Sequence, residues 1–91
     1  MKVANQKAMS LGYVERHGEK KDGTHYDIYF LAYVVEGEQE ARKMYMQAND
    51  YGLMRSCKEY GKWGQFFTFI GDVDSRGNIQ LEKLCEVEHD D

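Results

Sequence analysis

Proline is absent from this sequence, and cysteine occurs only twice among its 91 residues. No proline-rich or low-complexity stretch divides the chain, and its length suits one hydrophobic core. We therefore expect a single domain over residues 1–91, with flexible ends at 1–8 and 88–91. Without a signal for secretion, the two cysteines, Cys57 and Cys85, are expected to be reduced thiols.

Long apolar runs are also missing. No stretch approaches the roughly 20 apolar residues that a transmembrane helix needs. The first residues lack the apolar segment of a signal peptide. These absences predict a cytoplasmic protein with no membrane partner.

Positive charge is in deficit. The chain has 12 lysines and arginines against 16 acidic residues, which gives a net charge of -4. A net negative protein does not attract polyanions, so nucleic acid is an unfavoured partner. Basic residues are nevertheless concentrated locally at Lys20 and Lys21 and at Arg55, Lys58 and Lys62.

The first half of the sequence predicts a β-hairpin. Residues 11–17 alternate imperfectly, 18–23 form a polar turn, and 25–35 are rich in aromatic and β-branched residues. In this second arm, alternate positions share a face of the strand. The better core face is the set Tyr26, Ile28, Phe30, Ala32 and Val34, and the opposite face carries Tyr29 and Tyr33.

The second half predicts one helix and three strands. Apolar residues at three-to-four spacing predict an amphipathic helix over 36–51, ending at Gly52. Residues 53–60 form a weak strand and 65–73 a clear one, followed by a turn at 74–77 and a last strand at 78–87. The expected order is β-β-α-β-β-β. It corresponds to an α+β fold with one helix packed on a mainly antiparallel five-stranded sheet.

Two imidazoles and two carboxylates of the predicted hairpin form the most specific cluster of polar residues. If the hairpin pairs His17 with His25, then Glu15 faces Asp27 on the same side of the ribbon. Such a set suits a divalent metal or a small ligand, whereas a different register leaves only a solvated hairpin end. We keep this site as an alternative and commit to no metal and no cofactor.

Catalytic patterns are weak. Cys57 is the one candidate nucleophile, because Arg55 and Lys58 lie near it in sequence and favour a thiolate. No companion base is identifiable, so we do not expect an enzyme. A second alternative is single-stranded nucleic-acid binding through Lys62, Trp63 and Phe66, where aromatic rings stack on bases.

Aromatic residues are abundant, at 13% of the chain, and we expect some of them to be exposed. Exposed tyrosine and tryptophan are common anchors of protein interfaces. Our leading hypothesis is a small non-enzymatic inhibitor of viral or phage type that occludes a larger, nucleic-acid-binding protein. The last strand offers a long edge that could pair with a second copy of the chain, so a homodimer is also possible. The expected partner-binding residues are Tyr13, Tyr29, Tyr33, Glu36, Glu38, Glu40, Tyr60 and Trp63.

Overall fold

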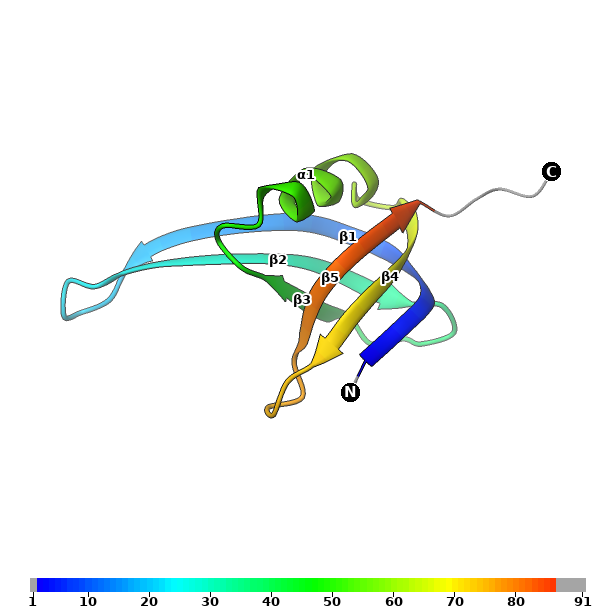
Figure 1. Ribbon diagram of the computed structural model, residues 1–91, viewed down its shortest axis with the longest axis horizontal. Coiled ribbons are helices and arrows are strands. Elements are labelled where there is room, and N and C mark those ends of the chain that lie inside the picture. The colour runs from blue at the N-terminus through cyan, green and yellow to red at the C-terminus, as the bar shows by residue number, and fades with distance from the viewer. Residues whose placement is uncertain (1, 87–91) are drawn as a thin grey trace.

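The computed structural model describes residues 2–86, which form a closed five-stranded β-barrel with one helix (Figure 1). Around the barrel the strands follow the order β1-β2-β3-β5-β4, and β4 returns to pair with β1. All pairings are antiparallel except that of β3 with β5. The elements are β1 (Lys2–Glu19), β2 (His25–Val35), β3 (Arg42–Met46), α1 (Tyr51–Tyr60), β4 (Phe66–Val73) and β5 (Ile79–Glu86).

The barrel closes because β1 is long enough to pair with two strands. Residues 2–9 pair with β4 and residues 8–19 with β2, so Ala8 and Met9 pair with both strands. Just after this overlap, Leu11 is an extra residue that shifts the register from Ser10 to Gly12. This bulge bends the strand and reverses which positions face inward. Ala8 and Ser10 point into the barrel before the bulge, whereas Tyr13 packs against the core after it.

Ser10 ties the bulge to the loop that follows the helix. Its buried hydroxyl donates to the carbonyl oxygen of Gly61 and accepts from the backbone N–H of Gly12 at 3.0 Å. Its backbone N–H donates to Gln65 at 2.8 Å, and its carbonyl accepts from Gly64 at 2.7 Å. A buried hydroxyl with all these partners avoids the desolvation cost of an unpaired polar group.

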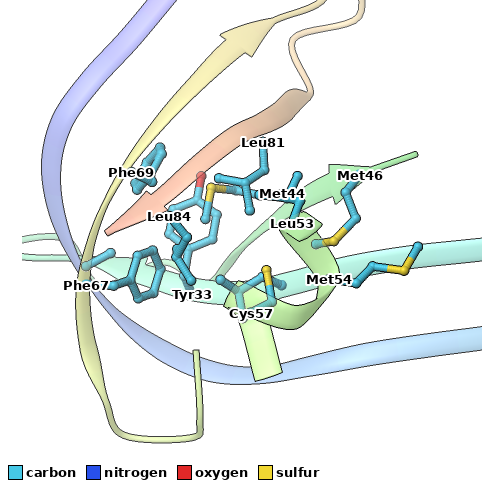
Figure 2. Packing of buried hydrophobic residues seen from close by; sticks show 12 residues of the cluster. Tyr33, Met44, Met46, Leu53, Met54, Cys57, Phe67, Phe69, Leu81 and Leu84 are labelled. Carbon is cyan, nitrogen blue, oxygen red and sulfur yellow. The ribbon is translucent and has the colours of Figure 1, made fainter. Parts of the chain in front are cut away.

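The core fills the barrel from all five strands and the helix (Figure 2). The rings of Tyr33, Phe67 and Phe69 contact one another at centroid distances of 5.4 to 6.4 Å. Such edge and tilted contacts add to the gain from burying the rings themselves. The helix contributes Leu53, Met54 and Cys57, which are buried on its inner side.

The expected open sheet and its order are therefore wrong. The observed order is β-β-β-α-β-β, and the barrel has no free sheet edge at β5, which lies between β4 and β3. Residues from Lys2 onward, expected as part of a flexible end, form the part of β1 that closes the barrel. The expected flexible end at 88–91 lies outside the described residues.

Between residues 36 and 60 the predicted order of helix and strand is reversed. A strand lies within the segment expected to be a helix, and a helix occupies the segment expected to be a strand. The short strand β3 directs Met44 and Met46 into the core. This alternation over five residues was too brief to outweigh the helical spacing around it. The real helix starts at Asp50, whose side chain accepts a hydrogen bond from the N–H of Leu53 at 3.1 Å. It ends at Tyr60, with Gly61 as its C-cap, and not at Gly52. The capping aspartate was the signal that sequence reasoning missed.

The expected core face of the second strand is also wrong. Leu31 and Tyr33 point into the barrel, so the alternate positions, including Phe30, lie on its outer side. The hairpin pairing of the first two strands, strands β4 and β5, and the turn between them were predicted correctly. In that turn, Gly77 donates to the carbonyl of Asp74 at 3.0 Å and takes a φ of +83°.

Five strands in this order, with the helix between β3 and β4, have the topology of the OB-fold, a Greek-key barrel. The hairpin of β1 and β2 continues beyond the barrel as a two-stranded arm, on the left of Figure 1. We define the arm as residues 15–29, from the pair of Glu15 and Tyr29, which lies beside the last residue of β3, to the turn.

We expect Ser10→Ala to lower the free energy of unfolding by about 1–3 kcal/mol, because it removes a buried donor and acceptor and leaves their partners unpaired. The measurement is urea denaturation followed by circular dichroism. Ser56→Ala is the matched control, since its hydroxyl bonds the carbonyl of Gly52 on the exposed side of the helix. Equal losses in both variants would contradict the role given to Ser10.

Candidate nucleic-acid interface

Aromatic rings lie side by side on the outer surface of β2 and β3. Register places Val14, Phe30 and Tyr45 in one row across three strands, and cross-strand partners share a face. The ring centroids of Phe30 and Tyr45 are 5.9 Å apart. Phe30 is only 4% exposed, yet it is not part of the connected core. It is covered from outside the barrel.

Two cations cover the Phe30 ring. The Arg16 guanidinium carbon lies 5.5 Å from its centroid, and the Lys43 ammonium nitrogen lies 5.0 Å from it. Both distances are typical of cation–π contacts. Arg16 comes from β1 and Lys43 from β3, so the cations flank the ring from the two neighbouring strands. We call Arg16, Phe30, Lys43 and Tyr45 the basic-aromatic face.

Acidic residues are absent from this side of the three strands in the described part of the chain. In β1 after the bulge, in β2 and in β3, every acid lies in the opposite, inward phase of its strand. Those acids are Glu15, Glu19 and Asp27. The alternation of the strands therefore separates positive from negative charge across the sheet.

A groove continues the basic-aromatic face toward the turn between β4 and β5. It has a volume of about 430 Å³ and is lined by Arg42, Lys43, Tyr45 and Asn78, with Glu40 as its one acid. In the other direction, the face extends along the arm to Ile28 and Tyr26, which are 37% and 38% exposed. The result is an elongated outer surface on which apolar and aromatic side chains are flanked by basic ones.

The expected tyrosine surface lies largely inside the barrel. Tyr33 is 1% exposed, and Tyr13 and Tyr29 are half-buried or pack against the core. The Tyr13 hydroxyl donates to Glu15 Oε1 at 2.9 Å. Burial and this bond raise the pKa of Tyr13, while the bond lowers the pKa of Glu15.

The three acids expected at a helix start lie elsewhere. Glu36 and Glu38 fall in the loop between β2 and β3, and Glu40 follows them just before β3. Glu38 pairs with Arg42 at 3.0 Å, and Glu36 lies 4.0 Å from Lys7. All are exposed, but they do not form one patch with the tyrosines.

The remaining predicted residues are at the end of the helix and after it. Tyr60 ends α1 and packs partly against the core. Trp63 is 75% exposed in the loop that Ser10 holds, and Phe66 is 45% exposed beneath Lys7, at 5.2 Å. Lys62 is exposed in the same loop.

The expected histidine cluster has a different register. His17 faces Asp27, with Nδ1 and Oδ1 2.7 Å apart, and His25 faces Glu19. Glu15 instead pairs with Lys58 at 3.4 Å. Among residues 2–86, no three metal-binding side chains come together. The shift by two positions keeps all these groups on one face but separates the two histidines.

Cys57 is not an activated nucleophile. It is fully buried in α1, and burial, with a smaller contribution from Asp50, raises the pKa of its thiol to about 12. The nearby charges of Arg55 and Lys58 therefore do not produce a thiolate. Cys85 is half-buried, and neither cysteine is in a disulfide.

Sequence reasoning missed the residues of the basic-aromatic face. Phe30 was assigned to the core, and Lys43 and Tyr45 to a helix. The available signal was that both faces of the strand are apolar or aromatic from Tyr29 onward, which leaves one face for a ligand once the other fills the core.

Neither a protein family, nor a curated protein, nor a solved structure matches this chain. Within residues 2–86, the single helix is too short and too polar to span a bilayer. The surface geometry of the barrel is therefore the basis for assigning a function.

At about pH 8.5, where an ordinary free thiol is about half ionised, we expect the native protein to react with a disulfide reagent at Cys85 and not at Cys57. A Cys85→Ser variant should react only after denaturant unfolds it, because the raised pKa and burial keep Cys57 protonated and inaccessible. The measurement is the absorbance of the released thiolate. Rapid labelling of the folded variant would contradict this assignment.

Proposed function

We propose that this protein binds single-stranded nucleic acid on the basic-aromatic face. The observation that carries the proposal is the pair of adjacent rings, Phe30 and Tyr45, with two cations on the Phe30 ring and no acid at the described outward strand positions around them. Proteins that bind single strands combine stacking rings with a positive groove along the backbone. The four residues supply both elements on one face of the sheet, because Phe30 and Tyr45 are cross-strand partners and the two cations lie on the Phe30 ring.

Topology supports the same surface. In OB-folds, oligonucleotides and oligosaccharides bind on the face of the second and third strands, between the loops that flank it. Phe30 and Tyr45 lie on those two strands here. The fold contributes only an analogy, and the ring and cation geometry gives that analogy chemical content.

The net charge of -4 is compatible with this proposal because the charge is unevenly distributed. Acids gather around a cleft formed by the loop before α1 and the β4–β5 hairpin, where Asp50, Asp74 and Glu82 lie. Asp74 also lines a smaller cleft beside Tyr45, in which Arg76 is a cation. The charged side chains in contact with the Phe30 ring are both positive, Arg16 and Lys43.

Binding rearranges the contacts of Phe30. Arg16 and Lys43 now rest on the ring that a base would stack upon. A base entering beside Tyr45 takes the place of one cation, and that cation moves to a phosphate of the strand. Long, flexible lysine and arginine side chains make this exchange without a change in the barrel.

The leading sequence hypothesis, an inhibitor that occludes another protein, stays a prediction. It relied on Tyr13, Tyr29 and Tyr33 as an exposed surface, and the barrel uses these side chains for its own packing. The expectations of no enzymatic activity and no bound metal likewise remain predictions. The nucleic-acid proposal is preferred because its residues are on the outside.

We expect Tyr45→Ala to weaken binding of a fluorescent oligo(dT) by roughly 5- to 150-fold, the equivalent of about 1–3 kcal/mol for one stacked base. Fluorescence anisotropy at low salt measures the affinity. Tyr51→Ala is the matched control, because Tyr51 is 72% exposed at the start of α1, on a different element. No binding by the native protein, or equal losses in both variants, would refute the proposal.

Charge reversal tests the backbone contact. We expect Lys43→Glu to weaken binding and to reduce the slope of log affinity against log salt by about 1 or more, because at least one phosphate contact is lost. Lys83→Glu, on β5, removes the same charge at a distance from the face and should change the slope little. An equal change of the salt slope in both variants would mean that binding depends on net charge and not on a phosphate contact of Lys43.

A further inference from the structure

The arm has an open strand edge. β3 ends at Met46, opposite Tyr29, whereas β2 continues through His25–Ile28. Within the described chain, no strand pairs with this side of those four residues. Unpaired backbone donors and acceptors in a row form a template for another strand.

The outer side of this edge lacks the usual protection, whereas its inner side carries His25 and Asp27. Natural edges are guarded by proline, bulges or outward charges. Here the outer side of the edge carries Tyr26 and Ile28, both exposed. The Tyr26 ring lies across Gly18, where a Cβ would be 2.3 Å from it. The opposite edge of the arm, in β1, is guarded by Glu15, Arg16 and His17.

We propose that the edge binds a second copy of this chain, antiparallel and about a two-fold axis, with Tyr26 opposite the partner's Tyr26. A two-fold axis perpendicular to the sheet places the outer side chains of both copies on the same side of the sheet. The residue opposite a given position can therefore change only in steps of two. Tyr26 against itself places Asp27 opposite the partner's His25. The next register, toward the barrel, places Asp27 against itself, and like charges directly opposite are destabilising.

The chosen register completes a row of alternating polar groups across four strands. On the inner side of the arm, His17 already contacts Asp27 at 2.7 Å, and Glu19 faces His25. Pairing aligns His17, Asp27, the partner's His25 and the partner's Glu19. Acids and imidazoles alternate along this row, and a symmetric row runs in the opposite direction.

The lysine turn of the arm then meets a cleft of opposite charge. With Tyr26 on the axis, the partner's turn, residues 20–23, lies beside the end of β3. Two adjoining clefts open there, and both are lined by Met46, Asp74 and Gln80. The larger, about 640 Å³, also contains Asp50 and Glu82. Exposed Lys20 and Lys21 are the complementary charges.

Pairing also stabilises the arm itself. An isolated two-stranded hairpin is only marginally stable in water, whereas a sheet of three or more strands can be stable. The dimer would join the two arms into a sheet of four strands. The two basic-aromatic faces lie on the same side of the resulting sheet, although the pairing does not depend on nucleic-acid binding. Because so short an edge buries less than about 1,200 Å², the dimer belongs to the weak class of interfaces.

Disulfide trapping tests the register. Directly opposite residues of an antiparallel pair have Cα atoms about 4.5–5.5 Å apart, within the range that a disulfide spans. In a Cys85→Ser background, we expect Tyr26→Cys to form a covalent dimer on mild oxidation. Ile28→Cys is the control, because two copies of that position are about 14 Å apart in this register. Cross-linking by the control and not by Tyr26→Cys would overturn the pairing.

Sedimentation without nucleic acid tests the charge contact. We expect a dimer at protein concentrations up to about 1 mM, a range that reaches weak affinities. The double variant Lys20→Glu/Lys21→Glu should weaken dimerisation about tenfold or more, and Lys83→Glu should not. A native protein that remains monomeric throughout would overturn the proposal. Oligonucleotide binding by that monomer would leave the proposed function standing, which separates the two failures.

Discussion

The structure depends on one requirement, that β1 belong to two halves of the barrel at once. The extra residue Leu11 bends the strand, and the hydroxyl of Ser10 fixes the bend to Gly61 after the helix. Before the bend, Ala8 and Met9 pair with both β4 and β2, and after it β1 continues with β2 toward the arm. The bend therefore lies just after the segment in which β1 closes the barrel.

The same bulge determines which side chains are available to a ligand. An extra residue reverses the inward phase of a strand, because side chains alternate with a period of two. Tyr13 thereby packs toward the core and Arg16 points outward, beside Phe30. Had the alternation of Ala8 continued unbroken, Arg16 would have faced the interior. The cation on the basic-aromatic face is thus a consequence of the bend.

Elements with a strong local signal could be predicted from the sequence. The turn at Asp74 is set by its own side chain, which accepts hydrogen bonds from Arg76 and Asn78 and has a lowered pKa for that reason. Local hydrogen bonds of this kind leave a signature in adjacent residues. Strand β3 has no such signature, because Met44 is placed by Leu31 and by the parallel contact with Ile79. Only tertiary pairing distinguishes it from a helix.

The candidate site was missed for a related reason. In residues 25–35 both faces are apolar enough to form a core, and composition favours the face with Phe30 over the face with Tyr33. Closure of the barrel makes the choice, since the curved interior takes Tyr33 beside Phe67 and Phe69. Phe30 then needs cover on the outside, which two cations provide. A ring covered on its outer side by Tyr45 and two long cationic side chains differs from a core residue in one respect, because the cationic side chains can move without disturbing the fold.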